Sequence, residues 1–143
     1  MLTGIEVRPD TKHAKYSQDL IHPDVVKMLR EINSVKAKIT IITDGKNGAC
    51  AYDGKKFYHA GEFPAKVVST LGAGDAFAST FTASIEKTDW DIEKSLKYAS
   101  VNSASVVEHF GAHAGFLTFD EIEKRLKKNP DFKINILKDK DVD

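Results

Sequence analysis

Residues 68–77 read Val68-Ser69-Thr70-Leu71-Gly72-Ala73-Gly74-Asp75-Ala76-Phe77. The stretch follows residues 66–68, which have the composition of a short strand, and it leads into apolar residues at helical spacing. The order strand, glycine-rich loop and helix is therefore predicted. At the start of such a helix the backbone N–H groups lack partners and the helix dipole adds positive charge. The loop Gly72-Ala73-Gly74 is thus predicted to bind an anion.

Asp75 directly follows this predicted anion site. A carboxylate would compete with a bound anion unless it acts on the incoming nucleophile, so a base beside an anion hole fits phosphoryl transfer. The spacing equally allows a structural interpretation, in which two glycines permit a tight turn and Asp75 caps the helix. The spacing by itself leaves both interpretations open.

Local patterns predict further elements along the chain. Apolar spacing predicts a helix over 23–33 and another from Asp91 to Gly111, and β-branched residues predict a buried strand over 38–43. The pair Asp53-Gly54 predicts a β-hairpin turn. Thr118 with a glutamate three residues later predicts a capping box at the start of a last helix. The chain is therefore expected to have the α/β fold class.

Composition excludes several classes of partner. The 21 basic and 21 acidic residues cancel and are scattered, so we expect neither nucleic acid nor an anionic membrane as partner. No apolar run approaches the ~20 residues of a membrane span, and the amino terminus lacks the pattern of a signal peptide. Cys50 is the single cysteine, which excludes an internal disulfide and a cysteine-rich metal site. We expect a cytoplasmic protein.

The stretch 68–77 resembles the second signature of PfkB/ribokinase-type carbohydrate kinases, D-T-x-G-A-G-D-A-F. By this resemblance Asp75 is the catalytic base, and Gly72, Ala73 and Gly74 form the anion hole for the γ-phosphate. The resemblance implies a ribokinase-like α/β fold, of which this chain is the carboxy-terminal part. That part is a mainly parallel sheet flanked by helices, with a β-hairpin. Residues 1–130 would be the nucleotide-binding part, and 131–143 a charged tail or an edge strand.

Two further segments agree with this resemblance. Residues 43–48 are similar to the family's T-x-G-x-x-G, which implies nucleotide binding by Thr43, Gly45 and Gly48. Residues 96–111 resemble the helix and following loop that shelter adenine, which places Ser100 and the Gly111-Ala112 turn near the base. Small residues in this helix are explained equally well by close helix packing, and that alternative stays open.

The resemblance also implies cofactors and partners. Residues 2–5 look like the segment just after the family's N-x-x-E element, which organises magnesium. ATP and Mg²⁺ are the expected cofactors, a sugar or similar small molecule is the expected substrate, and no protein-held metal site is assigned. The amino-terminal part of family members supplies the acceptor pocket. Self-association or pairing with such a part is therefore expected, and a catalytically incomplete nucleotide-binding or interaction module is the alternative to an active kinase.

The chain departs from the family pattern at three places. Ser69 stands where the family usually has Asp, which removes a negative charge from the region that holds a monovalent cation. Leu71 replaces what is often a small polar residue. His109 and Phe110 precede Gly111 where a basic pair is common. The resemblance therefore implies a weaker grip on cation and phosphate than is usual.

Overall fold

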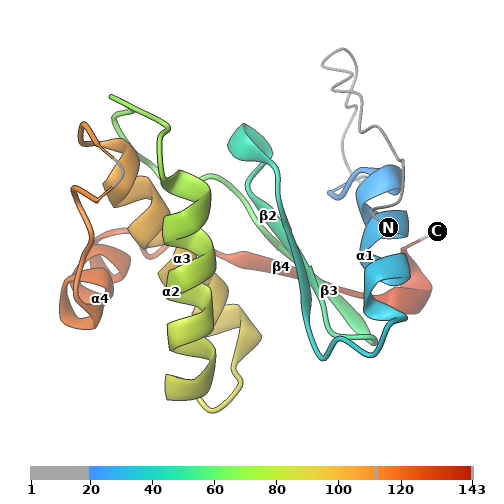
Figure 1. Ribbon diagram of the computed structural model, residues 1–143. Helices are drawn as coiled ribbons and strands as arrows, with labels where there is room; N and C mark the ends of the chain where they lie inside the picture. Colours follow the sequence, from blue (N-terminus) through green and yellow to red (C-terminus); the bar gives the residue numbers. More distant parts are fainter. Residues whose placement is uncertain (1–19, 112, 143) are drawn as a thin grey trace.

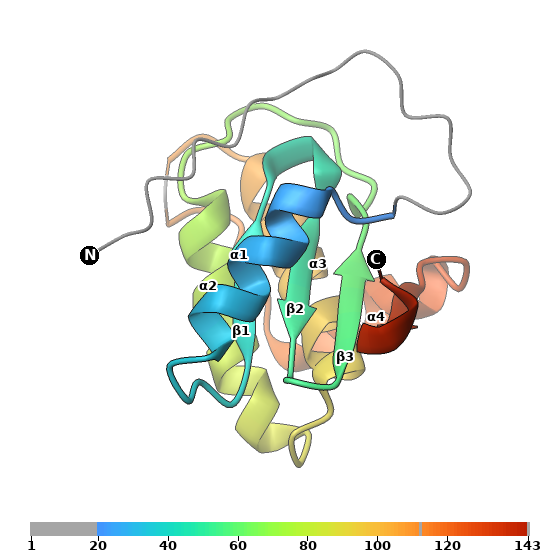
Figure 2. The ribbon, with the colours of Figure 1, turned by 90° about the vertical axis from the view of Figure 1, so that its right-hand side faces the viewer.

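The computed structural model describes residues 20–111 and 113–142. One four-stranded sheet lies between α1 on one face and the pair α2 and α3 on the other, and α4 packs on α3 (Figure 1). Figure 2 shows α1 lying across the near face of the strands. The elements in chain order are α1 (Pro23–Asn33), β1 (Thr40–Thr43), the 3-10 turn η1 (Gly45–Asn47), β2 (Ala49–Tyr52), β3 (Lys56–Ala60), α2 (Ala73–Lys87), α3 (Ile92–Val107), α4 (Phe119–Lys128), β4 (Ile134–Lys138) and the 3-10 turn η2 (Asp139–Asp141).

The prediction of a mainly parallel sheet is wrong for the described strands, because β1, β2, β3 and β4 pair antiparallel in that order. For β1, β2 and β3 the cause is the length of the connections. A short turn containing η1 joins β1 to β2, and the turn at Asp53-Gly54 joins β2 to β3. Parallel neighbours need a crossover of about a dozen residues or more, whereas a short turn can only return the chain antiparallel.

Residues 66–68, predicted as a strand, are in no strand of the described sheet. The N–H groups of Val68 and Ser69 instead donate to the carbonyl oxygen of Val107, at 2.7 and 3.1 Å. Val67 and Val68 are 53% and 40% exposed, so neither finds a sheet face to cover it. Valine favours a strand through packing on a pleated surface, and without that surface the preference is weak. This segment is therefore bound to the end of α3.

Predictions that rest on local signals are confirmed. Helix α1 begins at Pro23, and α4 has both hydrogen bonds of the capping box between Thr118 and Glu121. The predicted hairpin has Gly54 at φ +88°, and the Asp53 carboxylate accepts the N–H groups of Lys55 and Lys56 at 2.8 and 2.7 Å. Each of these signals depends on residues a few positions apart, which is why the sequence suffices for them.

The pleat of the sheet divides the core in two. Alternate residues of a strand face opposite sides, so β2 presents Ala49 and Ala51 to α2 and α3, and Cys50 and Tyr52 to α1. The tail, for which the sequence left two alternatives, forms β4 at the edge of the sheet, paired with β3. No helix in the described ranges has the length and apolarity that a membrane crossing requires.

A buried asparagine joins α2, α3 and the segment before α4. Asn102, 4% exposed, donates from Nδ2 to Thr80 Oγ1 at 2.8 Å and accepts the Leu117 N–H at Oδ1 at 2.9 Å. Both polar ends of this side chain are thus bonded, as buried polar groups must be for stability. The contact holds the loop after α3 close to the paired helices.

Gly48 and Gly45 form a matched pair of substitution sites in the turn after β1. A Cβ at Gly48 would lie 1.9 Å from the Ala60 carbonyl oxygen at φ +83°, whereas a Cβ at Gly45 meets nothing within 4 Å at φ +48°. We expect Gly48→Ala to lower the free energy of unfolding by about 3 kcal/mol or more, because strain and overlap add. Gly45→Ala should cost only about 1 kcal/mol for the left-handed backbone. Urea denaturation of both variants checks this, and equal losses would contradict it.

Candidate active site

The start of α2 is shaped by Gly72. This residue is the N-cap at φ +82°, in the left-handed region that glycine adopts without steric cost, and it turns the incoming segment into the helix. No side chain caps the helix, and the N–H groups of Gly74 and Asp75 have no hydrogen-bond partner among the described residues. Unpaired N–H groups together with the helix dipole make this end attractive to an anion.

Gly74 lies in the first turn of α2 and is exposed. A Cβ built there would meet nothing within 4 Å, and its φ is not in the left-handed region. Glycine inside a helix costs about 0.5–1 kcal/mol relative to alanine. Neither backbone conformation nor packing in the described part of the chain therefore calls for glycine here, which leaves close approach by a ligand as a reason for it.

Asp75 is the third residue of α2, and its side chain is exposed. No described residue forms a hydrogen bond or an ion pair with its carboxylate, and it does not cap the helix. The structural interpretation, in which Asp75 is the cap, thus lacks the hydrogen bond that it needs. The carboxylate is free to accept a proton from a group placed beside the helix end.

The turn 43–48 follows β1 and is firmly attached to the sheet. The Asp44 N–H donates to the Gly48 carbonyl oxygen at 2.8 Å, and the Asn47 side chain donates to the Asp44 carboxylate at 2.9 Å. His59 on β3 donates from Nε2 to the Asn47 carbonyl oxygen at 3.0 Å. The turn is therefore fixed by contacts within itself and to β3.

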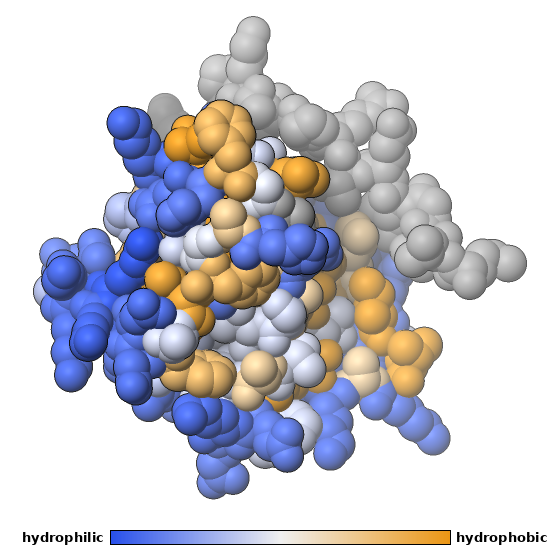
Figure 3. All heavy atoms as spheres, turned by 60° about the vertical axis from the view of Figure 1, so that its left-hand side comes forward, coloured by the Kyte–Doolittle hydropathy of each residue, from blue (hydrophilic) through white to orange (hydrophobic). Residues whose placement is uncertain are grey.

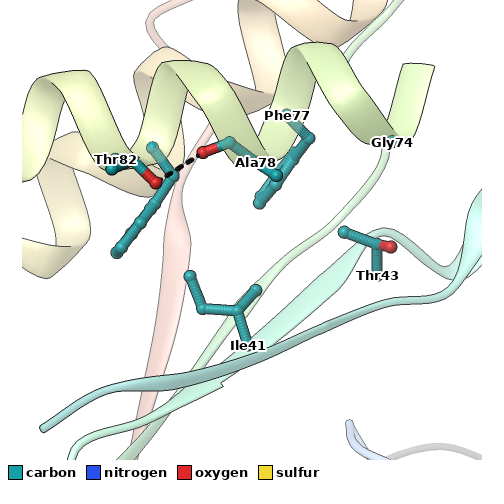
Figure 4. A pocket seen from close by; sticks show the side chains of 7 residues that line it. Ile41, Thr43, Gly74, Phe77, Ala78 and Thr82 are labelled. Carbon is teal, nitrogen blue, oxygen red and sulfur yellow. Dashed lines mark hydrogen bonds between the residues drawn. The ribbon is translucent and has the colours of Figure 1, made fainter. Parts of the chain in front are cut away.

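One pocket of about 220 Å³ brings the two predicted segments together. Thr43 at the end of β1 and Gly74 at the start of α2 both line it, and Figure 4 shows them on facing elements. Apolar side chains form most of the remaining wall; the other lining residues are Ile41, Phe77, Ala78, Phe81 and Thr82. The sequence placed Phe77 and Phe81 on an apolar helix stripe, but nothing local indicates that they flank a pocket.

Ser100 and Gly111 do not line this pocket. Ser100 is 7% exposed in α3, and Gly111 is exposed after the end of α3, at φ +94°. A packing role for Ser100 remains compatible with its burial. Residues 2–5, which resemble the segment after the magnesium element, and Ala112, which the adenine resemblance included, lie outside the described residues.

Other chemistry finds little support in the described part of the chain. Burial raises the pKa of the Cys50 thiol to about 12, with a smaller contribution from Asp44, so the thiol stays protonated and is a poor nucleophile at neutral pH. Among residues 20–111 and 113–142, no group of three or more His, Cys, Asp or Glu is placed to hold a metal ion.

The chain is similar in sequence to curated sugar kinases. 5-Dehydro-2-deoxygluconokinase of Clostridium botulinum (strain Eklund 17B) is 35% identical over 92 residues, which cover 64% of this chain and 27% of the relative. The enzyme of the same name from Geobacillus kaustophilus is 32% identical over 94 residues, covering 65% and 28%. The chain thus spans about a quarter of the length of these relatives.

Solved structures agree with the sequence comparison. A nucleoside kinase of Methanocaldococcus jannaschii, a member of the ribokinase family, is 27% identical with a TM-score of 0.63, over 76% of this chain and 34% of its own. A proposed ribokinase II from E. coli, solved with ATP and Mg²⁺, is 25% identical with a TM-score of 0.66, over 71% and 33%. The family description that matches residues 13–118 is "pfkB family carbohydrate kinase". The chain belongs to the pfkB family of carbohydrate kinases.

Proposed function

We propose that this chain carries the phosphoryl-transfer site of a kinase that phosphorylates a hydroxyl of a sugar or related small molecule with ATP. The observation that carries the proposal is the pocket in which Thr43 and Gly74 meet, beside two N–H groups without a described partner and an exposed Asp75. An anion site and a free carboxylate on one helix turn are the two parts that this reaction needs.

In the proposed reaction charge gathers on the oxygens of the transferred phosphoryl group. The loop Gly72, Ala73 and Gly74 stabilises that charge, with the Gly74 N–H lacking a described partner and the Ala73 N–H donating to the Thr70 carbonyl oxygen at 3.3 Å. Asp75 accepts the proton of the attacking hydroxyl. Mg²⁺ bound together with ATP would neutralise phosphate charge. The E. coli structure with ATP and Mg²⁺ supports this pair of cofactors.

The remaining proposed contacts bind the nucleotide. Thr43, Gly45 and Gly48 would contact its phosphates from the turn after β1, which the pocket supports for Thr43. Ser100 and Gly111 are proposed near the base on the strength of the family resemblance. The acceptor is proposed only as a sugar or related molecule, because the matched region is about a quarter of each curated relative.

A second candidate is a module that is incomplete until it pairs with another copy or with the amino-terminal part of a kinase. No described strand pairs with the outer edge of β1, and an open edge can accept a further strand. On the adjoining face of α2, uncharged small residues are exposed next to Asp75: Gly74, Ala78, Ser79, Thr82 and Ala83. Figure 3 shows apolar and near-neutral atoms in the middle of this side of the molecule and hydrophilic atoms along its left and lower rim.

Asp75→Asn tests the role of the base. We expect phosphoryl transfer to fall at least about 100-fold, because the amide cannot accept the proton, while affinity for ATP changes little. Release of ADP with a panel of sugars, together with calorimetric titration of an ATP analogue, measures both quantities. Unchanged turnover in the variant would overturn the assignment.

Gly74→Ala tests the anion hole without disturbing the fold. We expect a stabilisation of about 0.5 kcal/mol, because the site is open and alanine favours a helix, together with loss of affinity for an ATP analogue with Mg²⁺. Gly61→Ala is the matched control, since its Cβ also meets nothing within 4 Å and it lies outside the pocket. Thermal melting and calorimetry report the two effects. Equal affinities of both variants would argue against an anion hole at Gly74.

Self-association tests the pairing surface. We expect sedimentation of the chain at micromolar concentration to show species larger than a monomer, because the open edge of β1 and the uncharged face of α2 attract a partner. Ala78→Arg, on the exposed face of α2, should shift the distribution toward monomer without unfolding the chain. A clean monomer of the unaltered chain would contradict self-association.

A further inference from the structure

Helix α3 contacts the start of α2 through a side chain that the pfkB signature does not include. The hydroxyl of Ser103 donates to the carbonyl oxygen of Ala73, the first residue of α2, at 2.9 Å. Ser103 is half-buried between the two helices. One turn further along α3, the carbonyl oxygen of Val107 accepts the N–H groups of Val68 and Ser69. The loop that leads into the anion hole and the first residue of α2 are thus both bonded to α3.

These bonds matter because they tie the turn to a second helix, whereas its other bonds lie within the turn itself: Ala73 N–H to the Thr70 carbonyl oxygen at 3.3 Å and Ala76 N–H to the Gly72 carbonyl oxygen at 2.9 Å. The first turn of a helix lacks partners for its N–H groups, and α2 has no capping side chain. The incoming residues 66–71 are in no described strand, so the sheet does not support them. The direction of the Gly74 and Asp75 N–H groups therefore depends on how Ala73 is held.

We propose that Ser103 is a positioning residue for the anion hole, which orients the first turn of α2 through the Ala73 carbonyl group and does not itself touch the phosphate. This inference rests on the proposed function. It names a residue outside the signature that maintains the geometry of the anion hole. The Ala73 carbonyl group and the Gly74 N–H belong to one planar peptide unit, so a donor that fixes the carbonyl also fixes the direction of the N–H, and Gly74 lines the pocket.

The competing explanation is that the small residues of α3 serve only close packing. Comparison with other serines of α3 distinguishes packing from positioning. Ser95 Oγ lies 2.9 Å from Thr88 Oγ1, at the opposite end of the helix pair. Ser105 is fully buried, and its hydroxyl has no hydrogen-bond partner among the described residues. Ser105→Ala therefore removes a hydroxyl from the same helix without removing a bond, and it is the matched control.

The test compares two nucleotides in calorimetric titrations with Mg²⁺: a non-hydrolysable ATP analogue, and ADP, which lacks the γ-phosphate. We expect Ser103→Ala to weaken the analogue about fivefold, the equivalent of one hydrogen bond, and to leave the affinity for ADP within about twofold. Ser103→Thr, which keeps the hydroxyl, should bind like the unaltered chain, and so should Ser105→Ala. Equal weakening of both nucleotides, or no weakening of the analogue, would overturn the proposal.

Amide hydrogen exchange without nucleotide tests the same inference independently of binding. The Ala76 N–H, bonded to the Gly72 carbonyl oxygen at 2.9 Å, should exchange faster in Ser103→Ala and at the original rate in Ser105→Ala. Unchanged exchange in Ser103→Ala would overturn the positioning role. If the unaltered chain binds neither nucleotide, the proposed function fails for this chain, and the exchange rates still decide whether Ser103 holds the turn.

Discussion

The packing of α2 against α3, above an alanine-lined face of the sheet, determines where everything else in the site lies. Phe77 and Phe81 of α2 are buried in one cluster with the small strand residues Ala49, Ala51 and Ala60. Helix α2 makes its most extensive contact with α3, which in turn contacts β3 and β4, and burial of the two phenyl rings stabilises this arrangement by roughly 3–6 kcal/mol. Because the same helix face is anchored, the start of α2 lies beside the end of β1. Thr43 and Gly74 can then line one pocket.

The candidate site combines groups without partners and a surrounding frame that is well bonded. Two N–H groups at the start of α2 and the carboxylate of Asp75 have no described partner. Around them, Ser103 holds Ala73, Val107 holds the incoming segment, and His59 holds the turn after β1. Unpaired groups at a rigid position can meet a ligand without reorganisation, which is the arrangement that electrostatic stabilisation of a transferred phosphoryl group requires.

The outer edge of β1 and the neighbouring face of α2 form a side of the described molecule that lacks the usual charged surface. The described sheet ends at β1, whose outer edge has no described strand beside it, and the neighbouring face of α2 is uncharged over three turns apart from Asp75. Exposed helix faces usually carry charged residues that keep them in water. The matched region is about a third of the solved relatives, so in those proteins further chain is present beyond it. The proposed pairing surface and the proposed phosphoryl-transfer site therefore share α2.

The sequence by itself determined the features that depend on neighbouring residues: the starts of α1 and α4 and the hairpin at Asp53-Gly54. It also carried the family resemblance, through the signature at residues 68–77. Tertiary structure alone decided three further matters. Residues 66–68 became a segment bonded to Val107, because strand formation needs a neighbouring strand that local preference cannot supply. Strand β4 paired antiparallel with β3 across the intervening helices, against the expectation of a mainly parallel sheet, whereas short turns already direct β1, β2 and β3 antiparallel. Tertiary structure also placed Thr43 and Gly74 in one pocket and Ser103 within hydrogen-bond distance of Ala73. Contacts between residues distant in sequence follow from how the helices pack on the sheet and on each other, and no local sequence pattern predicts them.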